Sequence, residues 1–229
     1  MDSQKSWSEL ASSSLLLKAV SSWRKDPDSW LEGSFERLPE TVRVNPLRTD
    51  SKWVEEWISE QGGKPVPWFK GPGTAWQMPF SRGLAEGKAR EMLIALHETG
   101  RITRQETVSM IPVLALEVSK GDYVLDMCAS PGSKTTQISE CLGEGGVVFA
   151  NEISNSRANT LVSNVHRHGS KSAVIINHDG RHLPNMPNHG FDKVLVDAPC
   201  TGSATTRKNP EVWQKWTPEG GRSLHDLQI

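Results

Sequence analysis

The sequence predicts an α/β protein built on a doubly wound parallel sheet, with a small α+β region before it. Short apolar runs recur about every 25 residues in the second half of the chain, and helix-length segments lie between the first three of them. Acidic or amide residues follow the runs. Alternation of strand and helix at this pitch is typical of parallel sheets, whose ligands bind beyond the carboxyl ends of the strands.

The expected strands and helices of the sheet can be placed individually. The strands are residues 123–126, 147–150, 173–176 and 193–196, and the helices are 135–142 and 154–168. The segment before the first strand, residues 107–118, is apolar and partly helical, with Pro112 starting or interrupting the helix.

The N-terminal part has mixed patterns. Residues 9–24 carry apolar residues partly on one face and predict an amphipathic helix, and Asp26-Pro27-Asp28 predicts a turn. Residues 41–45 alternate as in a strand, and two further helices are predicted at 52–61 and 85–97. The stretch 65–79, rich in Pro, Gly and Trp, predicts loops with short strands.

Composition excludes several classes of protein. The 229 residues are 36% hydrophobic and 23% charged, as in a soluble globular protein and unlike a disordered chain. With 26 basic and 27 acidic residues the net charge is −1, so binding of nucleic acid by bulk charge is excluded, although a local basic groove is not. No apolar run reaches the roughly 18 residues of a membrane span, and no signal pattern opens the chain, so a cytoplasmic location is expected.

The three cysteines, Cys128, Cys141 and Cys200, fit neither a zinc motif nor a disulfide framework. No metal site is predicted. Cys141 is expected in the core, and Cys128 in a loop beside a ligand. Cys200 follows Pro199 at a strand end, where a thiol can act on a bound ligand; the alternative is a small buried hydrophobic residue.

The loop after the first strand is a candidate ligand site. Small residues and Gly132 let a ligand approach the backbone before a helix opens, yet the loop is neither a dinucleotide fingerprint nor a P-loop. Glu152 ends the second strand, where a carboxylate can bind ribose hydroxyls, although an exposed Glu is often just solvated. Asp179 can face an adenine amino group or cap a helix, and Asp197 ends the fourth strand. Acids at three successive strand ends point to S-adenosylmethionine rather than NAD.

Several motifs resemble those of a known family. The segments DMCASPGSKTTQ (126–137), NHD (177–179) and DAPCTG (197–202), the lead-in at 102–112 and the upstream element Arg43-Val44-Asn45 are similar to the Nop/Sun (RsmB-like) RNA cytosine-5 methyltransferases. The resemblance covers about residues 35–229. Arg207-Lys208-Asn209-Pro210 with Trp213 and Trp216 is most similar to the eukaryotic-type tRNA branch.

This resemblance implies a Rossmann-like class I methyltransferase sheet that is incomplete at the C-terminus. It assigns residues 1–100 to an N-terminal α+β RNA-binding region and 101–229 to a truncated S-adenosylmethionine-dependent domain. The implied substrate is RNA, with tRNA favoured and ribosomal RNA as the alternative; a nuclear location is then open if the source is eukaryotic. A splayed base is expected, because carbon 5 of cytosine must be reached outside the stack.

The resemblance also implies roles for individual residues. The catalytic residues are Cys200, Asp197 and Lys134, with Asp197 and Lys134 on the pyrimidine. The cofactor-binding residues are Cys128, Ala129, Ser130, Pro131, Gly132, Ser133, Lys134, Glu152, Arg157, Asp179 and Asp197. Arg207, Lys208, Lys215, Trp213 and Trp216 can contact RNA or belong to a solvated loop with tryptophans in the core.

One departure from the family concerns the nucleophile. In the family the cysteine after Pro, here Cys200, assists product release, and a second cysteine further on attacks the base. No cysteine follows Cys200 in this sequence. The sequence therefore leaves open whether Cys200 is the nucleophile or the release residue, and a non-catalytic RNA-binding remnant is the alternative to an enzyme.

Overall fold

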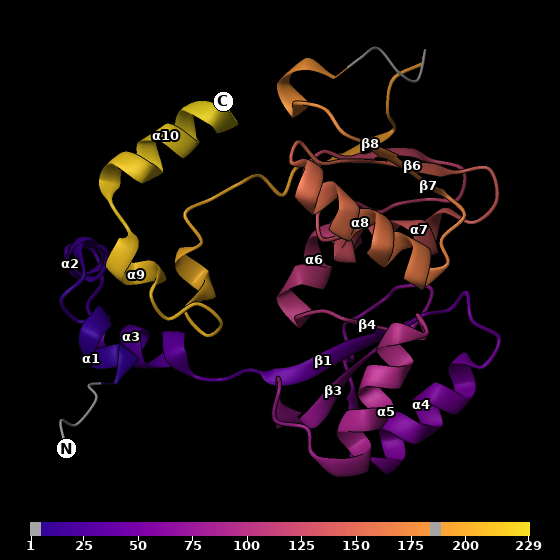
Figure 1. Cartoon of the computed structure of the whole chain (residues 1–229), viewed down its shortest axis with the longest axis horizontal. Helices are drawn as coiled ribbons and strands as arrows, with labels where there is room; N and C mark the ends of the chain where they lie inside the picture. Colours follow the sequence, from indigo (N-terminus) through magenta and orange to yellow (C-terminus); the bar gives the residue numbers. More distant parts are fainter. Residues whose placement is uncertain (1–5, 184–188) are drawn as a thin grey trace. The chain divides into compact units, whose positions relative to one another are not determined.

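The computed structural model describes residues 6–183 and 189–229 and divides the chain into two compact units (Figure 1). Unit 1 combines residues 1–38 with 198–229, and unit 2 spans residues 39–197. The boundary expected at residue 100 lies inside unit 2, and the division into RNA-binding and methyltransferase regions stays a prediction.

Unit 2 contains the parallel sheet. Its strands are β5 (Tyr123–Asp126), β6 (Val147–Asn151), β7 (Ala173–Ile176) and β8 (Lys193–Leu195), paired in the order β7-β6-β5-β8. All three pairings are parallel, which confirms the predicted α/β class. The chain starts at β5 in the middle of this order and reverses direction between β5 and β8, which creates the point where ligands of such sheets bind.

Helices cover one face of this sheet. Figure 1 shows α7 (Ser133–Leu142) and α8 (Asn155–His168) on the same side. Alternate strand residues such as Val124, Val148 and Leu195 point to that side and are buried with Ile138 and Leu142 of α7. On the opposite face Val174 and Val194 are exposed.

A second, antiparallel sheet completes unit 2. It pairs β2 (Lys64–Pro65), β3 (Thr74–Ser81), β1 (Pro39–Val44) and β4 (Ile102–Arg104) in that order. The helices α4 (Ser51–Glu60) and α5 (Gly87–Glu98) contribute to the same core, and α6 (Thr107–Ala115) follows β4. Pro112 lies inside α6, where it removes one intrahelical hydrogen bond.

Unit 1 is helical and differs from the prediction for its start. The expected helix at 9–24 is two helices, α1 (Trp7–Ala11) and α2 (Leu15–Ser21). The serines between them end one helix and cap the next: Ser12 Oγ donates to the Glu9 carbonyl over 2.6 Å, and Ser14 Oγ accepts from the Leu17 amide at 3.1 Å.

The predicted turn at Pro27 is the beginning of a helix. Pro27 takes the first position of α3 (Pro27–Phe35), where its missing N–H costs nothing. The remaining elements of unit 1 are the C-terminal helices α9 (Val212–Lys215) and α10 (Pro218–Gln228), and the short 3₁₀ helix Ser203–Thr205 precedes them.

Candidate active site

The loop between β5 and α7 is fixed by its backbone. Gly132 has φ 108°, a conformation that L side chains rarely adopt, and a Cβ there would lie 2.9 Å from Leu161 Cδ1. The preceding bond, Ser130-Pro131, is cis. Ala129 donates its N–H to the Asn151 carbonyl over 2.8 Å, which ties the loop to the end of β6.

Ser130 and Arg157 fasten this loop to α8. Ser130 Oγ donates to the Arg157 carbonyl over 2.9 Å, and Arg157 Nη2 donates to the Ser130 carbonyl over 2.9 Å. Two expected cofactor residues, one on each segment, therefore lie in direct contact. Arg157 Nη2 also lies 3.4 Å from Glu152 Oε2, so the same guanidinium joins the loop to the end of β6.

Glu152 is held in a defined position just after β6. Its carboxylate is only 3% exposed, and Oε1 accepts a 3.0 Å hydrogen bond from the Ser154 N–H. The expectation of a merely solvated side chain is therefore wrong. A fixed carboxylate beside a loop of small residues can accept hydrogen bonds from vicinal hydroxyls, so these groups fit the nucleoside part of S-adenosylmethionine.

Lys134 and Asp197 meet where the strand order reverses. Lys134 is in the first turn of α7 after β5, and Asp197 follows β8. Lys134 Nζ donates to Asp197 Oδ2 over 2.7 Å and to Ser109 Oγ over 3.1 Å. Two residues expected to share a substrate base are therefore brought together, and Ser109 of α6 joins them.

Ser109 lies in the lead-in at 102–112, but the sequence assigned it no role in the site. It lies 25 residues before Lys134, on the segment that the apolar pattern predicted to be partly helical. Gln105 Nε2 donates to the Ser109 carbonyl over 3.1 Å, which fixes the start of α6 against the site.

Asp126 ends β5 beneath the loop and is buried. Burial raises the pKa of its carboxyl to about 6, although the hydroxyl of Thr135 donates to Oδ2 over 2.7 Å. Oδ1 has no hydrogen-bond partner among the described residues. A carboxyl in this environment holds a proton near neutral pH more readily than an exposed one.

Asp179 caps a short helix. Its Oδ1 accepts the Arg181 N–H at 3.0 Å, and its Oδ2 accepts Arg181 Nη2 at 2.6 Å, at the start of the 3₁₀ helix Gly180–His182. These bonds hold the pKa of the Asp179 carboxyl well below its usual range. Asp179 therefore caps a helix, as one of the two predictions for this residue stated, and its contact with adenine stays a prediction.

The three cysteines lie in different environments. Cys128 is half-buried in the loop, where burial and then the nearby carboxylates raise the pKa of its thiol. Cys141 on α7 donates to the Gln137 carbonyl, and burial raises the pKa of its thiol to about 11. Cys200 is exposed and belongs to unit 1, three residues after Asp197 in the chain; the Gly202 N–H donates to its Sγ over 3.4 Å. Of the three thiols, Cys200 is the most accessible to a reactant.

The C-terminal aromatic segment belongs to the core of unit 1. Trp213 is 1% exposed, stacks on Trp30 with ring centroids 4.9 Å apart, and donates Nε1–H to the Ser203 carbonyl. Arg207 donates to the Glu36 and Gly33 carbonyls, so its side chain ties the two parts of this unit together. Trp213 is therefore a core residue, and the prediction that its side chain contacts RNA is wrong.

No helix in the described part of the chain combines the length and the apolar character that crossing a membrane requires.

Known proteins resemble the chain in sequence. Residues 113–229 match the family model of the 16S rRNA methyltransferases RsmB/F. The multisite-specific tRNA:(cytosine-C(5))-methyltransferase of Saccharomyces cerevisiae is 33% identical to this chain. The alignment covers 99% of this chain and 39% of the yeast protein. The ribosomal RNA small subunit methyltransferase F of Aliivibrio fischeri is 34% identical over 88% of this chain and 42% of its own. The chain thus spans about two fifths of the length of these curated relatives.

A solved structure has the same fold. The crystal structure of PH0851 aligns with a TM-score of 0.76 at 25% identity, over 100% of this chain and 52% of that one. A methyltransferase homolog from Pyrococcus horikoshii aligns with a TM-score of 0.61 at 27% identity, over 82% and 59%. The fold of this chain therefore recurs in other proteins.

Proposed function

This chain belongs to the RsmB/F methyltransferase family, and we propose that it carries the cofactor and base-binding part of an S-adenosylmethionine-dependent RNA (cytosine-5) methyltransferase. The observation that carries this proposal is the Lys134–Asp197 ion pair at the point where the strand order reverses. A cation and a carboxylate held together there can contact neighbouring polar atoms on one edge of a ring.

The proposed cofactor site lies between the loop and Glu152. Residues 128–133 present mostly small side chains and backbone groups, and Lys134 follows them. Glu152 offers a fixed acceptor for ribose hydroxyls, and Arg157 holds the loop and Glu152 in place. Asp179 is proposed at the adenine end. When bound, S-adenosylmethionine supplies the methyl group.

The chain's own residues would act on the pyrimidine. Carbon 5 of cytosine is a poor nucleophile until a thiolate adds to carbon 6. Asp197 would contact the N3 and N4 edge of the ring and pass a proton to N3, so that the addition leaves a neutral enamine. Lys134, whose Nζ lies 2.7 Å from Asp197 Oδ2, would donate to the ring at the same edge. After methylation a base removes the carbon 5 proton, the thiolate leaves, and the ring regains its double bond.

Cys200 is proposed to act in this cycle, either as the attacking thiolate or as the residue that assists elimination. Its exposure and its place three residues after Asp197 support a reactive rather than a packing role.

The favoured substrate is tRNA. The Saccharomyces cerevisiae relative, which aligns over 99% of this chain, carries tRNA in its name, as does a Drosophila melanogaster relative that is 38% identical over 71% of it. Ribosomal RNA is the second candidate, because the family model and the Aliivibrio fischeri relative carry that name.

Transfer of a labelled methyl group tests the proposal. The protein is incubated with methyl-labelled S-adenosylmethionine and either unmodified tRNA transcripts or a small-subunit ribosomal RNA transcript, and 5-methylcytosine is then identified in the digested RNA. Label in tRNA cytosines is expected. Binding of RNA and cofactor without any label would favour a non-catalytic RNA-binding protein.

A further inference from the structure

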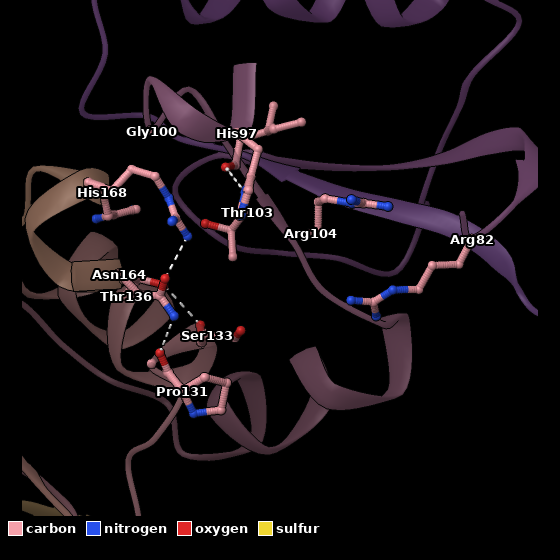
Figure 2. Close-up of a pocket in the computed structure, with 13 residues that line it drawn as sticks. Arg82, His97, Gly100, Thr103, Arg104, Pro131, Ser133, Thr136, Asn164 and His168 are labelled. Atoms are coloured by element: carbon pink, nitrogen blue, oxygen red, sulfur yellow. Dashed lines mark hydrogen bonds between the residues drawn. The ribbon is translucent and has the colours of Figure 1, made fainter. Parts of the chain in front are cut away.

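A small polar pocket lies in unit 2 and shares part of its wall with the proposed cofactor loop. Its volume is about 280 Å³, and it is formed by β4, the start of α7 and the end of α8 (Figure 2). Pro131, Gly132 and Ser133 form part of its wall, so it shares the first turn of α7 with Lys134.

Three arginines give this pocket a positive charge. Arg82, Arg104 and Arg167 line it, and none of its 13 lining residues is acidic. Figure 2 shows Arg82 and Arg104 on the same side of the pocket, across from Pro131 and Asn164. Guanidinium groups grouped in this way match the geometry and charge of a phosphate.

Arg104 and Arg167 are held in place by other side chains. Glu40 is buried and accepts from Arg104 Nε over 2.9 Å, and Asn164 Oδ1 accepts from Arg167 Nη2 over 2.6 Å. A guanidinium that is already ordered loses little conformational freedom when it binds an anion.

Arg82 is less constrained than these two. Its side chain is 41% exposed, and its Nη1 lies 3.8 Å from Glu106, a long distance for an ion pair. It can therefore turn toward a ligand while the other two stay fixed.

A histidine lies beside two of these arginines. His97 also lines the pocket, and burial first, then the charge of Arg167, lowers the pKa of its imidazole, with a smaller contribution from Arg104. The Ile102 carbonyl and Glu98 act in the opposite direction.

We propose that this pocket binds a backbone phosphate of the RNA whose cytosine is methylated, an inference that rests on the proposed function. Ser133 lines the pocket and the next residue, Lys134, reaches Asp197, so a ligand that touches both places must carry phosphate and base at separate positions. An RNA strand has this chemistry. A free phosphate or a single nucleotide shares only the phosphate.

The salt dependence of RNA binding tests this pocket. The dissociation constant of a fluorescent tRNA transcript is measured at several salt concentrations for the wild type, Arg82→Gln and Arg90→Gln. Arg90 is an exposed arginine on α5 that does not line the pocket, so its substitution changes the net charge equally. We expect Arg82→Gln to weaken binding by about threefold to tenfold and to reduce the slope of log K against log salt by about 0.7 to 1. Arg90→Gln should change neither to that extent.

The outcomes separate this proposal from the proposed function. If the two substitutions have equal effects and the wild type binds RNA, the proposal that this pocket binds an RNA phosphate is wrong, and the proposed function is unaffected. A wild type that binds no RNA would overturn both. Thermal stabilisation by inorganic phosphate that Arg82→Gln abolishes, without a difference in RNA affinity, would assign the pocket to a free anion and overturn the RNA contact.

Discussion

Arg43 and Glu140 form an ion pair that is completely enclosed by protein. Nε of Arg43 lies 2.9 Å from Oε2 of Glu140, and the two side chains are 0% and 1% exposed. The pair joins β1 of the antiparallel sheet to α7 of the parallel sheet, and Arg43 Nη2 also donates to Thr136 Oγ1 over 2.9 Å. His168 Nε2 also lies 2.9 Å from Oε1 of Glu140. The upstream Arg-Val-Asn element therefore connects the two sheets of unit 2.

Removal of one partner from this pair should be strongly destabilising. Arg43→Met leaves the Glu140 carboxylate buried without its cation, so we expect a loss of about 3–5 kcal/mol in the free energy of unfolding. Urea unfolding followed by circular dichroism measures it. The control is Arg101→Met, because the pair between Arg101 and Asp50 is partly exposed and should contribute less than about 1 kcal/mol.

A second substitution shows whether charge is the cause. Glu140→Gln added to Arg43→Met removes the unpaired charge, so part of the lost stability should return. A double variant no more stable than Arg43→Met would mean that packing, not charge, explains the loss.

The buried carboxyl of Asp126 should make stability depend on pH. Its pKa of about 6 lies above the value of 3.8 for an ordinary Asp, so the folded state holds the proton more tightly than the unfolded chain. This contribution to stability is complete below pH 3.8 and is lost as the pH rises through about 6. The side chain of the Asp126→Asn variant does not titrate, so the stability of this variant should lack the contribution.

Unfolding of wild type and Asp126→Asn at two pH values measures this contribution. Between pH 5 and 7.5 the wild type should lose about 1–2 kcal/mol more than the variant. Subtracting the change in the free energy of unfolding of the variant from that of the wild type removes the contributions of the other titrating groups. Parallel changes in both proteins would show that Asp126 ionises as it does in the unfolded chain.

The short strands of the parallel sheet could be predicted because each is a local apolar run. The predicted 147–150 and 173–176 match β6 and β7 to within one residue. The prediction of a single helix at 9–24 was wrong because the side chains of three serines hydrogen-bond to backbone groups and so interrupt the helix. A hydrophobic pattern contains no information on such bonds.

The positions of Lys134 and Asp197 could also be predicted from local sequence, whereas their other contacts could not. Lys134 and Asp197 were expected from their motifs, each of which follows a strand, and their contact follows from the pairing of β5 with β8. The contacts of Arg43 with Glu140 and of Lys134 with Ser109 join residues 97 and 25 positions apart. They depend on how the helices pack, and no local pattern encodes that packing.

Binding of the cofactor should depend on Glu152. Glu152→Ala removes a fixed acceptor for ribose hydroxyls, so we expect affinity for S-adenosylmethionine to fall by about 1–3 kcal/mol. Calorimetry with the exposed Glu144→Ala as control measures the effect. Glu152→Gln keeps an oxygen for the Ser154 N–H and should bind with intermediate affinity. Unchanged affinity in Glu152→Ala would remove this residue from the proposed site.

Lys134 should matter for turnover more than for cofactor affinity. Lys134→Met removes a donor aimed at the proposed base position, and we expect kcat to fall by about 100-fold or more. Affinity for S-adenosylmethionine should change little, since the side chain of Lys134 bonds to Asp197 and Ser109. Lys171→Met, an exposed lysine after α8, is the matched control. A loss of cofactor affinity with unchanged kcat would place Lys134 in the cofactor site alone.

The two proposed roles of Cys200 predict opposite results in one denaturing gel. As the release residue, Cys200 acts after methyl transfer, so Cys200→Ala in a protein that also carries the family's attacking cysteine should accumulate a covalent protein–RNA adduct that survives denaturation. As the nucleophile, Cys200 forms the bond to carbon 6, so the same variant should form no adduct.

RNA that carries 5-fluorocytosine sharpens this test, because the proton that elimination must remove from carbon 5 is replaced by fluorine. Wild type should be trapped on this RNA in either case, whereas Cys200→Ala should be trapped only if another thiol attacks the base. Cys141→Ala is the thiol control, since the Cys141 thiol is held in unit 2 by its hydrogen bond to Gln137 and its raised pKa keeps it protonated. Where the family's attacking cysteine is present, we expect the adduct with Cys200→Ala, in agreement with the family resemblance. A Cys200→Ala protein that methylates at the wild-type rate and leaves no adduct on ordinary RNA would exclude both roles.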